Sequence, residues 1–232
     1  MFVLVLIFVV PALLISDANA QQTELENQVQ VALERLEKAT YLDEVSRKQT
    51  LSQLENAQSM LVDAKEQRRL AKNYEETAAS ASQKTIDIQE KIEALNATKP
   101  DPDITQSLEE LENQLLLVVA EQNARLSSLA NKQSEQTALS FRANKIAEQL
   151  NAAKTDKIAI NNALADLDAN ASDLVDNTES LEKLTGAEKL TATIESLERE
   201  IATIPARQSI VDADIRLKQA QSRFAEKQIN IL

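Results

Sequence analysis

The chain has 232 residues and a formal net charge of −12, from 25 basic and 37 acidic side chains, with no basic run longer than Arg68-Arg69. Nucleic acid and anionic lipid are therefore poor partners for it. His and Cys are absent and there is one Gly, which excludes Ser-His-Asp and Cys-His triads, His-ligated zinc, haem and Gly-rich phosphate loops. Because aromatic residues make up only 3%, long helices are favoured over a thick globular core.

The N-terminus carries an apolar run over residues 2–15, followed by Ala18-Asn19-Ala20 and polar residues from Gln21. This pattern predicts a secretory signal peptide of residues 1–20 that is cleaved after Ala20, and an exported protein. The alternative is a membrane anchor, but the run is shorter than the roughly 20 residues that a span requires. No charged residue precedes the run, which fits a true start a few codons upstream.

Two helices are expected next, over residues 22–40 and 43–96, with a turn at 40–43 between them. Apolar residues recur in steps of three and four in both segments. The stripe of the second is rich in Ala, which buries less area per residue, so we expect the second helix to be the less stable partner. Neither Pro nor Gly marks the turn, so one uninterrupted helix over 22–96 is the alternative.

A clear break follows at Lys99-Pro100-Asp101-Pro102-Asp103, because each Pro removes a backbone donor and keeps its preceding residue out of the helical region. Ser107 and Glu110 are spaced as a capping box for the next helix. Asp101 and Asp103 could suggest a cation site, but Ca²⁺ needs about six or more oxygens. We interpret the segment as a solvated turn.

The central helix is expected over residues 107–170, because one seven-residue frame continues from Leu108 to Leu174 without Pro or Gly. Such a frame is typical of a coiled coil. Its inward positions are Leu108, Leu111, Leu115, Val118, Gln122, Arg125, Leu129, Lys132, Gln136, Leu139, Ala143, Ile146, Leu150, Ala153, Lys157, Ile160, Leu164, Leu167, Ala171 and Leu174. The polar patch of Gln122, Arg125, Lys132 and Gln136 is expected to set the register or mark a kink rather than to bind a ligand.

Residues 170–185 are rich in Asn, Asp, Ser and Thr, which predicts a loop. Thr185 and Glu188 are spaced as a second capping box beside Gly186, so the last helix is expected over residues 187–230. Pro205 within it is expected to cause a kink. Short connections place successive helices antiparallel, and the predicted fold is an all-α, elongated antiparallel helical bundle, or coiled coil, of long helices over residues 21–232.

No residue is assigned a catalytic, cofactor-binding or metal-binding role. Glu109, Glu110 and Glu112 are the densest acidic cluster, but acidic side chains favour a helix N-terminus for structural reasons. Oppositely charged residues four positions apart, such as Glu121 and Arg125, are interpreted as solvated surface pairs. An enzyme and a small-molecule substrate are therefore not expected.

Short sequence stretches in three places resemble the periplasmic N-terminal coiled-coil domain, or porin domain, of large bacterial mechanosensitive channels. These channels are those of the small-conductance superfamily, potassium-dependent type. The stretches are Ser107-Leu108-Glu109-Glu110-Leu111-Glu112, Leu184-Thr185-Gly186-Ala187-Glu188, and Ile204-Pro205-Ala206-Arg207 followed by Ile215-Arg216-Leu217. The resemblance covers residues 41–229. Members of that family often have a Pro within the second helix, where this chain has Ala78-Ala79-Ser80-Ala81.

The resemblance implies a structural or sensing extension of a mechanosensitive channel that protects against osmotic downshock. No apolar run follows residue 20, so the pore is missing from this sequence, and we expect a fragment whose gene continues beyond Leu232. Its partner would then be the membrane channel domain of the same protein, with homo-oligomerisation through that domain, and its location the periplasm, attached to the inner membrane. The alternative is a stand-alone periplasmic coiled-coil adaptor or chaperone-like binding protein.

Overall fold

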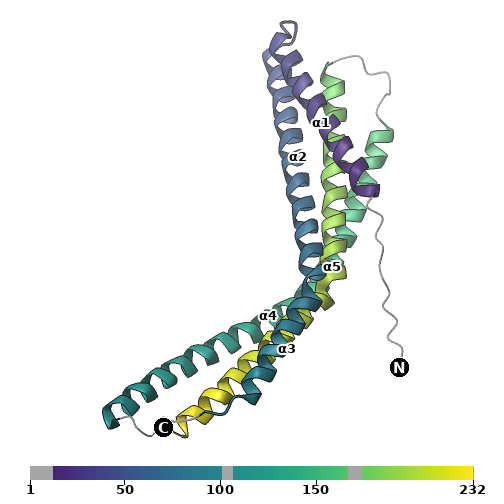
Figure 1. Cartoon of the computed structure of the whole chain (residues 1–232). Helices are drawn as coiled ribbons and strands as arrows, with labels where there is room; N and C mark the ends of the chain where they lie inside the picture. Colours follow the sequence, from purple (N-terminus) through teal and green to yellow (C-terminus); the bar gives the residue numbers. More distant parts are fainter. Residues whose placement is uncertain (1–12, 101–106, 167–173, 232) are drawn as a thin grey trace, which may run out of the picture. The chain divides into compact units, whose positions relative to one another are not determined.

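The computed structural model describes residues 13–100, 107–166 and 174–231, and within them it confirms the all-α fold class: long helices pack against one another and no strand is present. The helices are α1 (Leu13–Lys38), α2 (Glu44–Ala79), α3 (Ala81–Ala97), α4 (Leu108–Ala165) and α5 (Leu174–Ile229) (Figure 1). The predicted turn at residues 40–43 lies between α1 and α2. Some predicted features lie outside the described residues. They are most of the predicted signal peptide, Asp101 and Asp103, and residues 167–173.

The chain divides into two compact units. Unit 1 contains residues 1–69 and 151–195, and unit 2 contains residues 70–150 and 196–232. The division falls within α2, α4 and α5, so each of these helices contributes one segment to unit 1 and another to unit 2.

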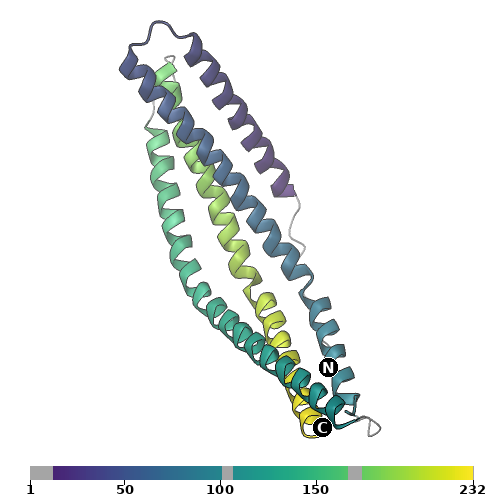
Figure 2. The ribbon, with the colours of Figure 1, turned by 90° about the vertical axis from the view of Figure 1, so that its left-hand side faces the viewer.

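In unit 1, α1 lies beside the first part of α2 and the first part of α5 (Figures 1 and 2). Its core is one cluster of buried side chains from these three helices, namely Leu25, Val29, Ala32, Leu36, Ala39, Leu54, Ala57, Leu61, Leu174 and Leu181. The residues from α1 recur in steps of three and four, which is the spacing that the sequence predicts for one face of a helix. The capping side chain of α2 is Asp43, whose Oδ1 accepts the Ser46 backbone N–H at 2.9 Å.

In unit 2, α5 has neighbours on two sides. Ile88 and Ile92 of α3 pack against Ala213, Leu217 and Ala220. On another side, Ile146 of α4 packs with Leu197 and Ile204 of α5. Contacts between α4 and α5 pair rising with falling residue numbers, from Gln122 with Ser222 to Arg142 with Glu200, so these two segments run antiparallel, as expected for consecutive helices.

The predicted frame of α4 matches its burial for most residues, since Leu139, Ile146 and Ala153 are buried. Leu108 and Gln136 are exposed, and Leu167 and Ala171 lie outside the described residues. The predicted capping box is confirmed: the Ser107 N–H donates to Glu110 Oε2 at 2.7 Å, and the Glu110 N–H donates to Ser107 Oγ at 3.3 Å.

The prediction of a loop over residues 170–185 followed by a helix from 187 is wrong for the part that is described. Helix α5 begins at Leu174 and continues through Gly186 and Pro205. Thr185 does not cap a helix; it is buried within α5 and donates its hydroxyl to the Leu181 carbonyl at 3.0 Å. Because Thr178 does the same to Leu174 at 2.8 Å, these polar side chains satisfy themselves locally and can be buried.

Gly186 lies at a close approach between helices and not in a turn. A Cβ atom there would lie 3.3 Å from Cδ1 of Ile160 in α4 and 3.5 Å from Sδ of Met60 in α2. The absence of a side chain therefore lets α5 approach both neighbours closely in unit 1.

The helix predicted over residues 43–96 is divided at Ser80. The backbone bonds continue across it, from the Ser80 N–H to Glu76 O and from the Lys84 N–H to Ser80 O, both at 3.1 Å. The Ser80 hydroxyl donates to Thr77 O at 3.0 Å. Ser80 thus makes a slight irregularity at the position where the resembling family often has Pro.

Candidate functional site: polar contacts around helix α5

Three buried or half-buried side chains link α1, α2 and α5 in unit 1. The Arg68 guanidinium donates to Gln22 Oε1 and also forms an ion pair with Glu188. Gln22 Nε2 in turn donates to the Leu61 carbonyl at 3.1 Å. Because the Glu188 side chain is only 4% exposed, this carboxylate depends on Arg68 to stabilise its charge.

Two further pairs in unit 1 connect α2 with α5 nearer the surface. Lys189 Nζ lies 2.7 Å from Asp63 Oδ2, and Asn56 Nδ2 donates to Glu182 Oε1 at 3.1 Å. Residue numbers rise together in both helices, so these two segments run parallel. These exposed contacts contribute alignment more than stability.

Unit 2 contains the second buried charge, Glu200 of α5. Arg142 of α4 donates to it twice, from Nε at 2.8 Å and from Nη2 at 2.6 Å. This bidentate geometry is the strongest form of the Arg–carboxylate pair. The hydrogen bond to Glu200 holds the pKa of Arg142 above its ordinary value, so the contact favours the charged guanidinium.

Tyr74 of α2 lies at the edge of the same contact. The Arg207 guanidinium lies 5.3 Å from the centre of the Tyr74 ring, within the range of a cation–π contact. Burial, together with the charge of Glu200, raises the pKa of the Tyr74 hydroxyl. Arg199 Nε pairs with Glu75 Oε1 at 3.0 Å beside it, so α2, α4 and α5 meet here through polar groups.

The four predicted polar residues of α4 all contact α5 in unit 2. Gln122 Nε2 donates to Ser222 Oγ at 2.8 Å, and Arg125 Nη1 donates to the Gln221 carbonyl at 3.3 Å. Lys132 Nζ lies 3.2 Å from Asp214 Oδ2, and Gln136 Nε2 donates to Asp212 Oδ1 at 2.6 Å. Each contact has a specific partner, which supports the expected role in setting register.

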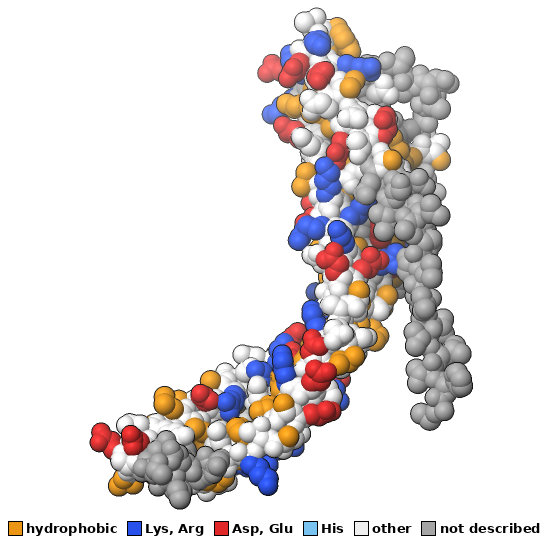
Figure 3. All heavy atoms as spheres, in the orientation of Figure 1, with side chains coloured by type: hydrophobic (Ala, Val, Ile, Leu, Met, Phe, Trp, Pro, Cys, Tyr) orange, Lys and Arg blue, Asp and Glu red, His pale blue; other side chains and the backbone are white. Residues whose placement is uncertain are grey.

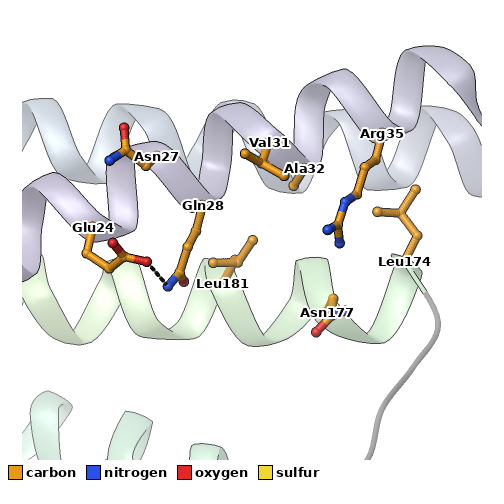
Figure 4. Close-up of a pocket in the computed structure, with 9 residues that line it drawn as sticks. All are labelled: Glu24, Asn27, Gln28, Val31, Ala32, Arg35, Leu174, Asn177 and Leu181. Carbon is orange, nitrogen blue, oxygen red and sulfur yellow. Dashed lines mark hydrogen bonds between the residues drawn. The ribbon is translucent and has the colours of Figure 1, made fainter.

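A groove lies between α1 and α5 in unit 1, with a volume of about 310 Å³ (Figure 4). Its lining mixes apolar Val31, Leu174 and Leu181 with Glu24 and Arg35. Glu24 accepts a hydrogen bond from Gln28 at 2.9 Å along α1 itself. Among the described residues, no group of acidic side chains is arranged to hold a metal ion, and Glu109, Glu110 and Glu112 are exposed.

Comparison with protein families matches residues 32–232 to the mechanosensitive ion channel porin domain. The chain belongs to this family. The match includes the whole region in which the sequence resemblance was seen, residues 41–229. A search of curated proteins gave no match, and neither did a search of solved structures. The family is that of a channel-associated domain and not an enzyme family, whereas the potassium-dependent type stays a prediction.

In this porin domain, none of the helices within the described residues is long and apolar enough to cross a membrane. Charged groups of both signs cover much of the face seen in Figure 3. The polar contacts described above connect helices of the domain with one another, so they can align and stiffen a bundle.

The buried ion pairs of the domain, with Glu188 and Glu200, were not predicted from the sequence. A signal was nevertheless present, because Thr178, Thr185 and Ala192 recur every seven residues, as do Ala206, Ala213 and Ala220. Such a second stripe of small residues indicates a helix packed on two sides, where nearby charges are also buried.

Proposed function

We propose that this porin domain is a periplasmic structural or sensing extension of a mechanosensitive ion channel and contributes to protection against osmotic downshock. The family match over residues 32–232 carries the proposal. Export is supported by the predicted signal peptide of residues 1–20, and attachment to the inner membrane would follow if the gene continues into a channel domain.

The helices suit such a role mechanically. Helix α4 contains 58 residues and α5 contains 56, so each is about 80–90 Å long at about 1.5 Å per residue. Within each unit, ion pairs fix the register of these helices, as Arg68–Glu188 does in unit 1 and Arg142–Glu200 in unit 2. Register-fixed helices respond to force as a set rather than by sliding singly.

Location is tested by N-terminal sequencing of protein from a periplasmic extract. A mature N-terminus at Gln21 is expected. Recovery of soluble cytoplasmic protein that retains Met1 would contradict export and, with it, the periplasmic role.

The link to a channel is tested by sequencing the DNA downstream of the Leu232 codon and by measuring the survival of cells after osmotic downshock. A continuing frame with apolar segments of about 20 residues is expected. In-frame deletion of residues 21–232 should then change survival after osmotic downshock or the tension at which the channel opens in patch-clamp recordings. Unchanged survival and unchanged tension would contradict a sensing role.

A stand-alone adaptor is the second candidate, favoured by the exposed turn between α1 and α2. Tyr41 is 71% exposed and Val45 is 78% exposed there, and large apolar side chains at the end of a bundle can bind a partner. A stop codon directly after Leu232 would support this candidate. The double variant Tyr41→Ser, Val45→Ser should then reproduce the phenotype that deletion of the gene causes.

A further inference from the structure

The outward face of α4 in unit 2 is free of charge over a long distance. We label the seven-residue frame a to g, with Leu108 at position a and Leu111 at position d. Positions b, c, e and f then point away from α5, and between Asn113 and Asn144 they contain no Asp, Glu, Lys or Arg. The charged residues in this range, Glu121, Arg125, Lys132, Glu135 and Arg142, all lie at positions d or g. There they pair with α5 or with one another.

This face is exposed and partly apolar. Leu116 is 68% exposed, Leu117 67% and Phe141 72%. Figures 1 and 2 show α5 along one side of α4 and no helix along the other. Helix α3 in the same unit shows the ordinary pattern, because its exposed face carries Lys84, Asp87, Glu90, Lys91 and Glu93. A water-facing helix surface normally has such charges, so their absence from α4 indicates a surface that is covered in the assembled protein.

We propose that this uncharged face binds the same face of a second copy of the chain, with the two α4 helices antiparallel. A chain with a net charge of −12 repels its own copies, and this repulsion is least where both contacting surfaces are uncharged. The inference does not rest on the proposed channel function.

The residues at the two ends of the face determine the orientation. In an antiparallel pair centred between Ser127 and Ala130, Leu116 packs against Phe141 of the other copy, and small residues face one another in between. Glu110 then lies near Lys145 of the other copy, twice by symmetry. The outermost pair, Glu109 with Glu148, has like charges but is exposed and screened. A parallel pair would instead place Glu109, Glu110 and Glu112 beside the same three carboxylates.

The size of the face agrees with a weak specific dimer. Residues 113–144 span about 48 Å at about 1.5 Å per residue, and a helix is about 10 Å wide. The two copies together would bury on the order of 1,000 Å², which is the lower limit for a specific interface.

The test is sedimentation equilibrium of the full chain over a range of concentrations, with surface variants. The wild-type chain should show a reversible monomer–dimer equilibrium. Leu116→Glu and Phe141→Glu should each raise the dimer dissociation constant by at least about tenfold, because every substitution occurs twice in a symmetric dimer. Ile86→Glu is the matched control: Ile86 is 51% exposed but lies on the charged face of α3, so dimerisation should be unchanged.

Orientation is tested by cysteine cross-linking, because the chain has no native Cys. A mixture of Leu116→Cys and Phe141→Cys chains should form mixed disulfides, whereas Leu116→Cys alone should not form a dimer. Efficient disulfide formation by Leu116→Cys alone would overturn the antiparallel arrangement. A wild-type chain that stays monomeric, or that binds neutral lipid vesicles through Leu116 instead, would overturn the proposal.

Discussion

The two units are held together in different ways. Unit 1 has one continuous core in which ten buried apolar residues of α1, α2 and α5 contact one another. Unit 2 has two separate clusters, with five buried residues between α3 and α5 and three between α4 and α5. Helix α1, which belongs only to unit 1, supplies four of these ten residues, and Ala39 directly after it supplies a fifth.

In unit 2, polar contacts between α4 and α5 help to hold the helices together. Between Gln122 and Arg142, α4 reaches α5 through hydrogen bonds and ion pairs at nearly every inward turn. Burial of apolar area is not directional, whereas each hydrogen bond requires one partner. The comparison indicates that unit 1 derives its stability from burial and that unit 2 derives its alignment from specific polar pairs.

The largest expected effect comes from opening the unit 1 core. Leu54 is fully buried, with 0% exposure, so Leu54→Ala should lower the free energy of unfolding by about 3–5 kcal/mol. Leu139→Ala in α4 of unit 2 is the matched change. Leu139 is 6% exposed and belongs to none of the described clusters, so we expect a loss of about 2 kcal/mol. Urea unfolding followed by circular dichroism measures both, and equal losses would contradict the comparison.

The second expected effect concerns the Glu200 ion pair of unit 2. Arg142→Met removes the bidentate donor and leaves a carboxylate that is 6% exposed, which should cost about 1–3 kcal/mol of stability. Arg69→Met is the control, because its partner Glu66 is 50% exposed and the loss of stability should be much smaller than for Arg142→Met. Adding Glu200→Leu to Arg142→Met should recover stability; a further loss would show that Glu200 has another essential partner.

The sequence predicted those features that depend on a single periodic pattern. The frame of α4, the turn at residues 40–43 and the Ser107–Glu110 capping box concern one helix and its immediate ends. Local spacing determines such features, because the groups that satisfy one another are within a few residues.

Features that depend on two neighbours at once were not predicted. Thr185, Gly186 and Glu188 resemble a helix start when only local spacing is considered. In the folded chain Gly186 provides close approach to Met60 and Ile160, and Glu188 pairs with Arg68. The partners are more than a hundred residues away in sequence or on different helices, so no local rule distinguishes a capping box from a packed helix interior here.

A third prediction tests that close approach. Gly186 lies inside α5, where Ala is favoured over Gly by about 0.5–1 kcal/mol. The added Cβ would meet only the ends of two flexible side chains, the nearer being Ile160 Cδ1 at 3.3 Å, which can move by a few tenths of an ångström. Gly186→Ala should therefore raise the melting temperature slightly, by a few degrees at most. A lower melting temperature would show that the α2–α5 spacing cannot relax.

The smallest expected effect is on pH dependence and compares one helix cap from each unit. Hydrogen bonds from Ser46 hold the pKa of Asp43 below its usual 3.8 in unit 1, and those from Ser107 hold the pKa of Glu110 below its usual 4.5 in unit 2. A carboxyl group with a lowered folded-state pKa contributes stability that is present above its unfolded pKa and is lost as the pH falls through the folded value. The urea midpoint should therefore fall as the pH is reduced from about 5 to about 3. Both groups are fully exposed, so the change should be slight.

Asp43→Asn and Glu110→Gln should each reduce the dependence of the urea midpoint on pH, because the substituted groups no longer titrate. If both variants keep the wild-type slope, the two helix caps do not contribute to the acid sensitivity.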